Sequence, residues 1–147
     1  MASIRQMFEL ATPVFFDAAH QLPDSVDLVS KKCARLHGHT YHALIRVEVI
    51  DNSRHGMTID FKELKDAIGG RLDHRYVNEV FDDHYGANAK EATAENIALF
   101  IVELISGVLH TRQVPCTSIT VALAEGYKGP DNTVYVTVRG NDGNDQV

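Results

Sequence analysis

Residues 39–50, HTYHALIRVEVI, alternate in the way typical of a β-strand with one face on a protein core. The two faces of this strand would carry Tyr41, Ala43, Ile45, Val47 and Val49 on one side, and His42, Leu44, Arg46 and Glu48 on the other. Residues 5–19, rich in Phe, Val and Thr, are also predicted to be extended. Residues 117–124 and 132–139 alternate again, and the turn-rich segment EGYKGPDN joins them.

Two helical patterns lie between these extended segments. Asp60 is a predicted N-cap, and the apolar stripe that follows it consists of Phe61, Leu64, Ile68 and Leu72. Thr93 is predicted to cap a longer helix with a period near 3.6 residues. The apolar positions of that helix are Ala94, Ile97, Ala98, Ile101, Leu104, Ile105 and Val108.

The predicted element order is therefore ββααββ, which is typical of an α+β domain. We expect a four-stranded antiparallel sheet with two helices on one face. Such a sheet leaves two edges unpaired, and pairing them with other subunits would protect them, so a homo-oligomer is expected. The 147 residues predict a single domain over residues 1–140, with a flexible polar tail at 141–147.

Composition narrows the classes of function. Hydrophobic residues make up 44% and charged residues 23%, as in an ordinary soluble globular protein. The chain has no run of 18 apolar residues and no signal-peptide pattern at its N-terminus, so no membrane association is expected. Its 2 cysteines favour a reducing, cytoplasmic location.

Charge is unevenly distributed along the chain. The net charge of −6 argues against nucleic-acid binding. However, residues 31–75 hold nine Lys and Arg against six Asp and Glu, a balance of +3, which leaves −9 for the rest. This segment indicates either a binding region for a small anionic ligand or an uneven scatter of surface charge.

The strongest chemical signal is His37-Gly38-His39. Residues two apart on a strand point to the same side, so the two imidazoles would converge on one point. His20 ends the first extended segment, and an adjacent antiparallel strand would bring it beside the pair. Three imidazoles and an open position are typical of catalytic zinc, although His-x-His also occurs by chance. The other histidines, except His74, are interpreted as scattered polar residues.

Three further groups each have two interpretations. Cys33 is flanked by Lys31, Lys32 and Arg35, which favour a reactive thiolate, but most cysteines are inert and apolar. The Asp73-His74 pair suits proton transfer or, equally, a capped helix end. Glu125 could accept two hydrogen bonds from an amidine-like edge, or be a solvated acid in a turn. Cys116 is interpreted as inert.

Six segments, taken in order, resemble the 6-pyruvoyltetrahydropterin synthase family over roughly residues 8–140: FDAAHQLP, CARLHGHTYH, IDFKELK, RLDHRYVN, TAENIA and AEGY. The short spacing from Cys33 to His37 is similar to that of the bacterial branch, the 6-carboxytetrahydropterin synthases of queuosine biosynthesis. The resemblance implies a tunnelling fold, in which the sheets of three subunits form a barrel and two trimers stack into a homohexamer. Active sites would then lie at subunit interfaces.

The resemblance also implies a reaction and a set of site residues. A zinc enzyme would convert 7,8-dihydroneopterin triphosphate to 6-carboxy-5,6,7,8-tetrahydropterin, and would release acetaldehyde and triphosphate. The implied residues are His20, His37 and His39 as zinc ligands, Cys33 as catalytic thiol, Asp73 and His74 as proton relay, Glu125 as pterin anchor, and Thr93 and Glu95 in the pterin pocket. Arg35 is a candidate substrate contact, since a triphosphate needs local positive charge.

Two features depart from the family pattern. Ala92 stands where the family often has Pro, and residues 82–91 do not align with it, so the conformation of residues 82–92 is left open. Three other functions remain in view. They are 6-pyruvoyltetrahydropterin synthase activity on the same substrate, a non-catalytic pterin- or metal-binding module, and a zinc hydrolase unrelated to pterins.

Overall fold

The computed structural model describes residues 5–24, 30–51, 55–126, 132–140 and 147. Within these ranges the elements are, in order, β1 (Met7–His20), β2 (His37–Ile50), α1 (Phe61–Leu72), β3 (Arg75–Tyr76), α2 (Val77–Tyr85), α3 (Ala94–Thr111), β4 (Cys116–Glu125) and β5 (Thr133–Arg139). The predicted α+β class and the four long strands are confirmed. The predicted turn at 52–56 and the segment 125–132 fall largely outside the described residues.

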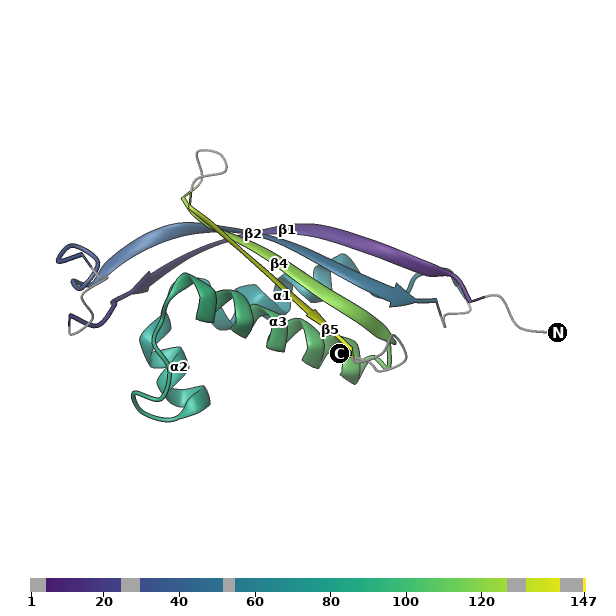
Figure 1. Ribbon diagram of the computed structural model, residues 1–147. Coiled ribbons are helices and arrows are strands. Elements are labelled where there is room, and N and C mark those ends of the chain that lie inside the picture. The colour runs from purple at the N-terminus through teal and green to yellow at the C-terminus, as the bar shows by residue number, and fades with distance from the viewer. Residues whose placement is uncertain (1–4, 25–29, 52–54, 127–131, 141–146) are drawn as a thin grey trace.

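The strands form one sheet in the order β3-β1-β2-β4-β5, curved over the helices (Figure 1). The long strands pair antiparallel along the sheet, and His20 at the end of β1 pairs with His37 at the start of β2. The prediction of four strands was wrong for the described part of the chain, which has five. The fifth, β3, has two residues and pairs in parallel with Ala18 and Ala19 of β1. A two-residue strand shows no alternation, so its sequence gives no signal.

The described residues also contain three helices rather than the predicted two. The additional helix, α2, has nine residues, and only Val77 and Phe81 of them are buried. Among the described residues, no side chain caps its first turn. Its apolar residues do recur at helical spacing, at Val77, Val80, Phe81 and Tyr85, so the helix was missed because no capping residue marks its start. The N-caps predicted for α1 and α3 are confirmed. The side chain of Asp60 accepts a hydrogen bond from the amide of Lys62, and that of Thr93 accepts one from the amide of Asn96.

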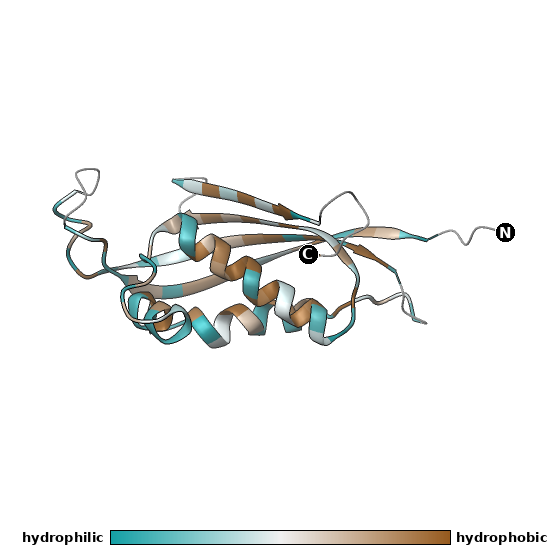
Figure 2. Ribbon diagram, turned by 60° about the horizontal axis from the view of Figure 1, so that its bottom comes forward, coloured by the Kyte–Doolittle hydropathy of each residue, from teal (hydrophilic) through white to brown (hydrophobic). Residues whose placement is uncertain are grey.

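The core lies between the sheet and the helices, which cover one face of the sheet (Figures 1 and 2). The alternation of β2 is confirmed, because one face of this strand is completely buried from Tyr41 onward: Tyr41, Ala43, Ile45, Val47 and Val49. Helix α3 is long and apolar enough to cross a membrane by length and composition alone. Its apolar side chains instead pack in the core: Ile97, Ala98, Phe100, Ile101, Val102, Ile105 and Leu109.

No helix among the described residues covers the opposite face of the sheet, which carries large exposed side chains, among them Phe15 at 60% and Tyr135 at 74% exposure. Strand β5 lies at one edge of the sheet. Of the predicted tail, residues 141–146 lie outside the described residues. Val147 donates its amide to the carbonyl of Cys116 at 3.0 Å.

Candidate metal and substrate site

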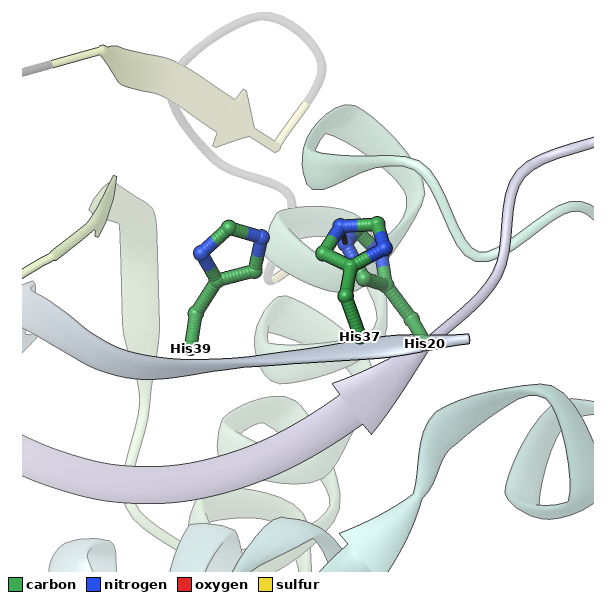
Figure 3. A group of neighbouring side chains, drawn as sticks. All are labelled: His20, His37 and His39. Carbon is green, nitrogen blue, oxygen red and sulfur yellow. Dashed lines mark hydrogen bonds between the residues drawn. The ribbon is translucent and has the colours of Figure 1, made fainter. Parts of the chain in front are cut away.

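The three histidines His20, His37 and His39 lie together where β1 ends and β2 begins (Figure 3). The pairing of His20 with His37 sets the first two side by side, and His39 follows two residues later on the same face. One ring nitrogen from each histidine lies within 4.8 Å of the others. The convergence predicted from spacing and strand pairing is therefore present.

Backbone carbonyls fix the tautomers of two of these rings. The Nδ1 of His20 lies 2.7 Å from the carbonyl oxygen of Ala92, and the Nδ1 of His37 lies 2.7 Å from that of Arg35. Since a carbonyl only accepts, each Nδ1 carries the proton and each Nε2 keeps a lone pair. These Nε2 atoms lie 2.9 Å apart, so two lone pairs face each other, an arrangement that a bound metal cation would stabilise.

The cluster fits a metal such as Zn²⁺. The Nε2 of His39 is buried and has no hydrogen-bond partner among the described residues, which is costly unless a ligand satisfies it. Burial is the main cause that lowers the pKa of His20 and of His39, so both favour the neutral form that binds metal. In tetrahedral zinc sites the ligand nitrogens are about 3.4 Å apart, close to the spacing of His20 and His37.

Glu125, the last residue of β4, lies at the edge of the histidine cluster. Its Oε1 is 4.0 Å from the Nε2 of His20, and its Oε2 is 3.9 Å from the Nε2 of His39. The carboxylate is 23% exposed, so it is not a fully solvated turn acid. No acidic residue is adjacent to the histidine pair in the sequence. Instead, the pairing of β4 with β2 brings the carboxylate of Glu125 to the histidines.

Tyr41 is a residue of this region that sequence reasoning treated only as core. It pairs with Glu125 across the strands and lies two residues after His39. Its ring lies 5.4 Å from that of His39 and is fully buried, and its hydroxyl has no partner among the described residues. Burial, with a smaller effect of Glu125, raises the pKa of Tyr41, so the hydroxyl stays protonated and can donate. The signal was available, because Tyr41 shares the face of both histidines.

Asp73 and His74 point together, with the Nδ1 of His74 at 3.0 Å from the Asp73 carboxylate. The amide of Asp17 donates to the same carboxylate at 2.9 Å, and it is the main cause that lowers the pKa of Asp73. His74 has a left-handed φ of 57° and donates its amide to the carbonyl of Asp17 at 2.7 Å. These contacts attach the pair to β1.

The His74 side chain is 79% exposed and lies at a cavity of about 590 Å³. The lining of this cavity includes Asp17, Gly38, His39, Thr40, Arg75 and Tyr76. Within the described residues, however, no hydrogen bond or ion pair joins Asp73 or His74 to the histidine cluster. Within one chain, therefore, His74 and His39 line the same cavity, but the described residues show no direct contact between the pair and the cluster.

Cys33 lies in the turn before β2 and is half-buried. Its carbonyl accepts from the amide of Leu22 at 3.0 Å, and its amide donates to the Oγ of Ser30 at 3.3 Å. It does not belong to the group of converging metal-ligand atoms. Lys31, Lys32 and Arg35 around it are exposed, as a region that receives an anion requires.

Thr93 and Glu95 lie at the start of α3. The Oγ1 of Thr93 accepts from the amide of Asn96 at 3.2 Å, so its observed contact is a helix cap. Glu95 is exposed in the first turn. Ala92, where Pro was expected, is fully buried and contributes its carbonyl to His20. Before it, the amide of Asn88 donates to the side chain of Asp82 at 2.8 Å, a bond that spans the turn after α2.

The chain is similar in sequence and in fold to known proteins. The family model described as 6-pyruvoyl tetrahydropterin synthase matches residues 9–141 of the chain. A 6-carboxy-5,6,7,8-tetrahydropterin synthase of Synechocystis is 34% identical over 117 residues, covering 70% of this chain and 83% of that protein. The protein of the same name from Bacillus subtilis is 29% identical over 118 residues, covering 80% and 79%.

A third relative has a different name. The dihydroneopterin monophosphate aldolase of Pyrococcus furiosus is 36% identical over 93 residues, covering 61% of this chain and 68% of that protein. Among solved structures, 6-pyruvoyltetrahydropterin synthase of Plasmodium vivax has a TM-score of 0.61 at 22% identity, covering 91% of this chain and 99% of that one. The Caenorhabditis elegans synthase has a TM-score of 0.57 at 23% identity, covering 95% and 100%. These likenesses establish the fold.

Proposed function

This chain belongs to the 6-pyruvoyl tetrahydropterin synthase family, and we propose that it is a zinc-dependent 6-carboxytetrahydropterin synthase. The proposed reaction converts 7,8-dihydroneopterin triphosphate and water to 6-carboxy-5,6,7,8-tetrahydropterin, acetaldehyde and triphosphate. One observation carries the proposal. In a chain with relatives of that name, three histidines converge and a carboxylate lies 3.9–4.0 Å from two of them.

In this proposal His20, His37 and His39 hold the zinc ion. Bound there, zinc would act as a Lewis acid toward the hydroxyls of the substrate side chain. Glu125 would accept two hydrogen bonds from the N–H groups at the amino-pyrimidine edge of the pterin. Its distance from the histidines supports this role, because it sets the ring beside the metal site and thereby directs the side chain toward it.

Two groups would move protons. The thiolate of Cys33 would act as general base on a C–H of the substrate side chain. His74, oriented by Asp73 at 3.0 Å, would accept or deliver a proton on the other face of the substrate. No nicotinamide is required, because the pterin ring is reduced while the side chain is oxidised.

The positive segment would receive the triphosphate. Arg35 and its neighbours Lys31 and Lys32 are exposed near Cys33, so their charge faces the solvent from which an anion arrives. Thr93 and Glu95 are proposed contacts in the pterin pocket, in addition to the helix cap that Thr93 provides. Arg71 has another environment, with its guanidinium 5.4 Å from the centre of the Phe100 ring.

We propose that the enzyme is a homohexamer, a dimer of trimers with its sites at subunit interfaces. The unpaired edge at β5 and the helix-free face with Phe15 and Tyr135 support assembly of the sheets. The lack of direct contact between His74 and the histidine cluster within the described chain also supports it, because a neighbouring copy could supply the relay. We place the enzyme in the cytoplasm, in the synthesis of queuosine.

Product analysis separates this function from its alternatives. The zinc-loaded protein is incubated with 7,8-dihydroneopterin triphosphate, and the products are identified by mass spectrometry. Acetaldehyde with a carboxypterin supports the proposal, whereas loss of triphosphate with conversion of the three-carbon side chain to a pyruvoyl group shows 6-pyruvoyltetrahydropterin synthase activity. Loss of phosphate with an otherwise intact substrate indicates a hydrolase, and an unchanged substrate indicates a binding module.

Because one relative is named a dihydroneopterin monophosphate aldolase, the experiment includes a second incubation, with 7,8-dihydroneopterin monophosphate as substrate. A retro-aldol cleavage of that substrate would release a phosphorylated two-carbon aldehyde and leave a hydroxymethylpterin. Faster turnover of the monophosphate to these products would replace the proposed function by aldolase activity. In both incubations Glu125→Gln is the matched control, because it keeps the size of the side chain and removes its charge.

A further inference from the structure

We call residues 30–35, which precede β2, the Cys33 turn. We propose that Gln21 is a positioning residue that fixes the position of the Cys33 turn relative to the proposed metal-binding end of β1. This proposal rests on the proposed function for its effect on turnover, and on geometry alone for its effect on the turn. Gln21 directly follows His20, and its side chain is exposed. We call Gln21 and Asn78, with the hydrogen bonds that join them to the Cys33 turn, the Gln21 brace.

The first part of the Gln21 brace fixes the backbone. The amide of Gln21 donates to the Oδ1 of Asn78 at 3.0 Å, and the Nδ2 of Asn78 donates to the carbonyl of Gln21 at 2.9 Å. The side-chain amide of Asn78 therefore pairs with both backbone groups of one residue, as a neighbouring strand would. This pairing holds the chain against α2 two residues beyond Ala19, the last residue that pairs with β3.

The second part reaches the Cys33 turn. The Nε2 of Gln21 donates to the carbonyl of Ala34 at 2.8 Å, and the amide of Leu22 donates to the carbonyl of Cys33 at 3.0 Å. Two consecutive residues after a proposed metal ligand thus bind two consecutive carbonyls of the turn. The bond from Leu22 belongs to the backbone, so the bond from Gln21 is the one that a substitution removes.

A third contact provides a control. The hydroxyl of Tyr76 donates to the Oε1 of Gln21 at 3.4 Å, which is long for an O–H donor and therefore weak. The 2.8 Å bond to Ala34 is shorter and connects to the residue after Cys33. A general base displaced by about 1 Å can lose up to a hundredfold in rate, so this bond is expected to affect catalysis more than binding.

The test compares Gln21→Met, which keeps the length of the side chain but cannot hydrogen bond to Ala34, with Tyr76→Phe. The first readout is the rate of alkylation of Cys33 by iodoacetamide in the zinc-loaded protein at about pH 8, followed by peptide mass spectrometry. Cys116 serves as the internal reference and should not be alkylated, because burial raises the pKa of its thiol to about 11. The other readouts are kcat, KM and zinc content.

We expect Gln21→Met to raise the alkylation rate of Cys33 about threefold or more and to lower kcat about tenfold. KM and zinc content stay within about twofold of those of the wild type. Tyr76→Phe is expected to stay within about twofold in alkylation rate and in zinc content.

Two results would overturn the proposal. Equal alkylation rates in the two variants would show that the side-chain bond does not hold the turn. Loss of zinc in Gln21→Met would place its effect at His20 instead. If the wild-type protein does not turn over the pterin, the proposed function fails, while the alkylation rates still decide whether Gln21 holds the turn.

Discussion

The Nδ1 of His20 donates a hydrogen bond to the carbonyl oxygen of Ala92 at 2.7 Å, across 72 residues of sequence. This bond joins the end of β1 to the segment that leads into α3. It also leaves the Nε2 of His20 free to face His37, so a single backbone carbonyl selects the metal-binding tautomer. Because the acceptor is a main-chain atom, the interaction does not depend on the side chain at position 92, where Ala stands instead of the Pro that the resemblance suggested.

Removing one imidazole should abolish metal retention. His37→Ala deletes one of the three proposed ligands and leaves the lone pair of His20 without its neighbour, so we expect zinc to be lost on dialysis. Metal content is measured by atomic emission after dialysis against a weak chelator. His42→Ala is the matched control, because His42 is on the same strand but stacks on Phe15 on the helix-free face. Full zinc content in His37→Ala would contradict the ligand assignment.

Replacing the proposed base should separate chemistry from folding. Cys33 is half-buried in a turn and contributes no ligand to the histidine cluster, so Cys33→Ala is expected to keep its zinc and its thermal unfolding temperature. Turnover of 7,8-dihydroneopterin triphosphate should fall at least about a hundredfold, the usual contribution of a positioned base. Cys116→Ala is the control for losing a thiol outside the site. Activity of Cys33→Ala within a few-fold of the wild type would exclude the role of base.

Neutralising Glu125 should weaken substrate binding more than folding. Glu125→Gln keeps the side-chain volume, but its amide can accept only one of the two hydrogen bonds proposed from the pterin edge. We expect Kd for a pterin analogue to rise about tenfold or more, measured by isothermal titration in the zinc-loaded protein. The unfolding temperature should change little, because Glu125 lies at the end of β4. An unchanged Kd would refute the anchor role.

Local patterns predicted most of the fold. The alternation of β2, the caps at Asp60 and Thr93 and the convergence of the three histidines all follow from short-range spacing and one antiparallel pairing. Strand β3 was missed for a physical reason. It exists because His74 adopts a left-handed conformation and its amide binds the carbonyl of Asp17, and both depend on the fold around them.

The site was harder to predict where it depends on register. Glu125 lies beside the histidines because β4 pairs with β2 so that Glu125 is opposite Tyr41. A shift of one residue would turn its carboxylate to the other face of the sheet. The carbonyl of Ala92 contacts the ring of His20, and the side-chain amide of Asn78 contacts the backbone of Gln21; both contacts join distant segments, so no local sequence pattern indicates them.

Thr93 should contribute to stability as a helix cap. Thr93→Ala removes the oxygen that accepts from the amide of Asn96, so we expect the free energy of unfolding to fall by about 1 kcal/mol in urea denaturation. Thr93→Ser keeps that oxygen and should restore most of the loss. If Thr93 acted only through the substrate, Thr93→Ala would raise KM and leave the unfolding free energy unchanged.

The metal-free protein should lose stability as the pH falls below the ordinary histidine range. Burial lowers the pKa of His20 and His39 below the value of 6.5 that they have when the chain is unfolded. Between the two values the unfolded chain binds more protons than the folded one, so the free energy of unfolding rises with pH there. This contribution is complete above about pH 6.5 and is progressively lost as the pH falls toward the folded-state pKa values.

The measurement is thermal unfolding of chelator-treated protein between about pH 8 and pH 5. His39→Gln cannot take up a proton, so its unfolding temperature should fall less steeply over this interval than that of the wild type. His42→Gln lies on the opposite face of β2 and should keep the wild-type slope. Equal slopes for His39→Gln and the wild type would mean that burial of His39 does not favour its neutral, metal-binding form.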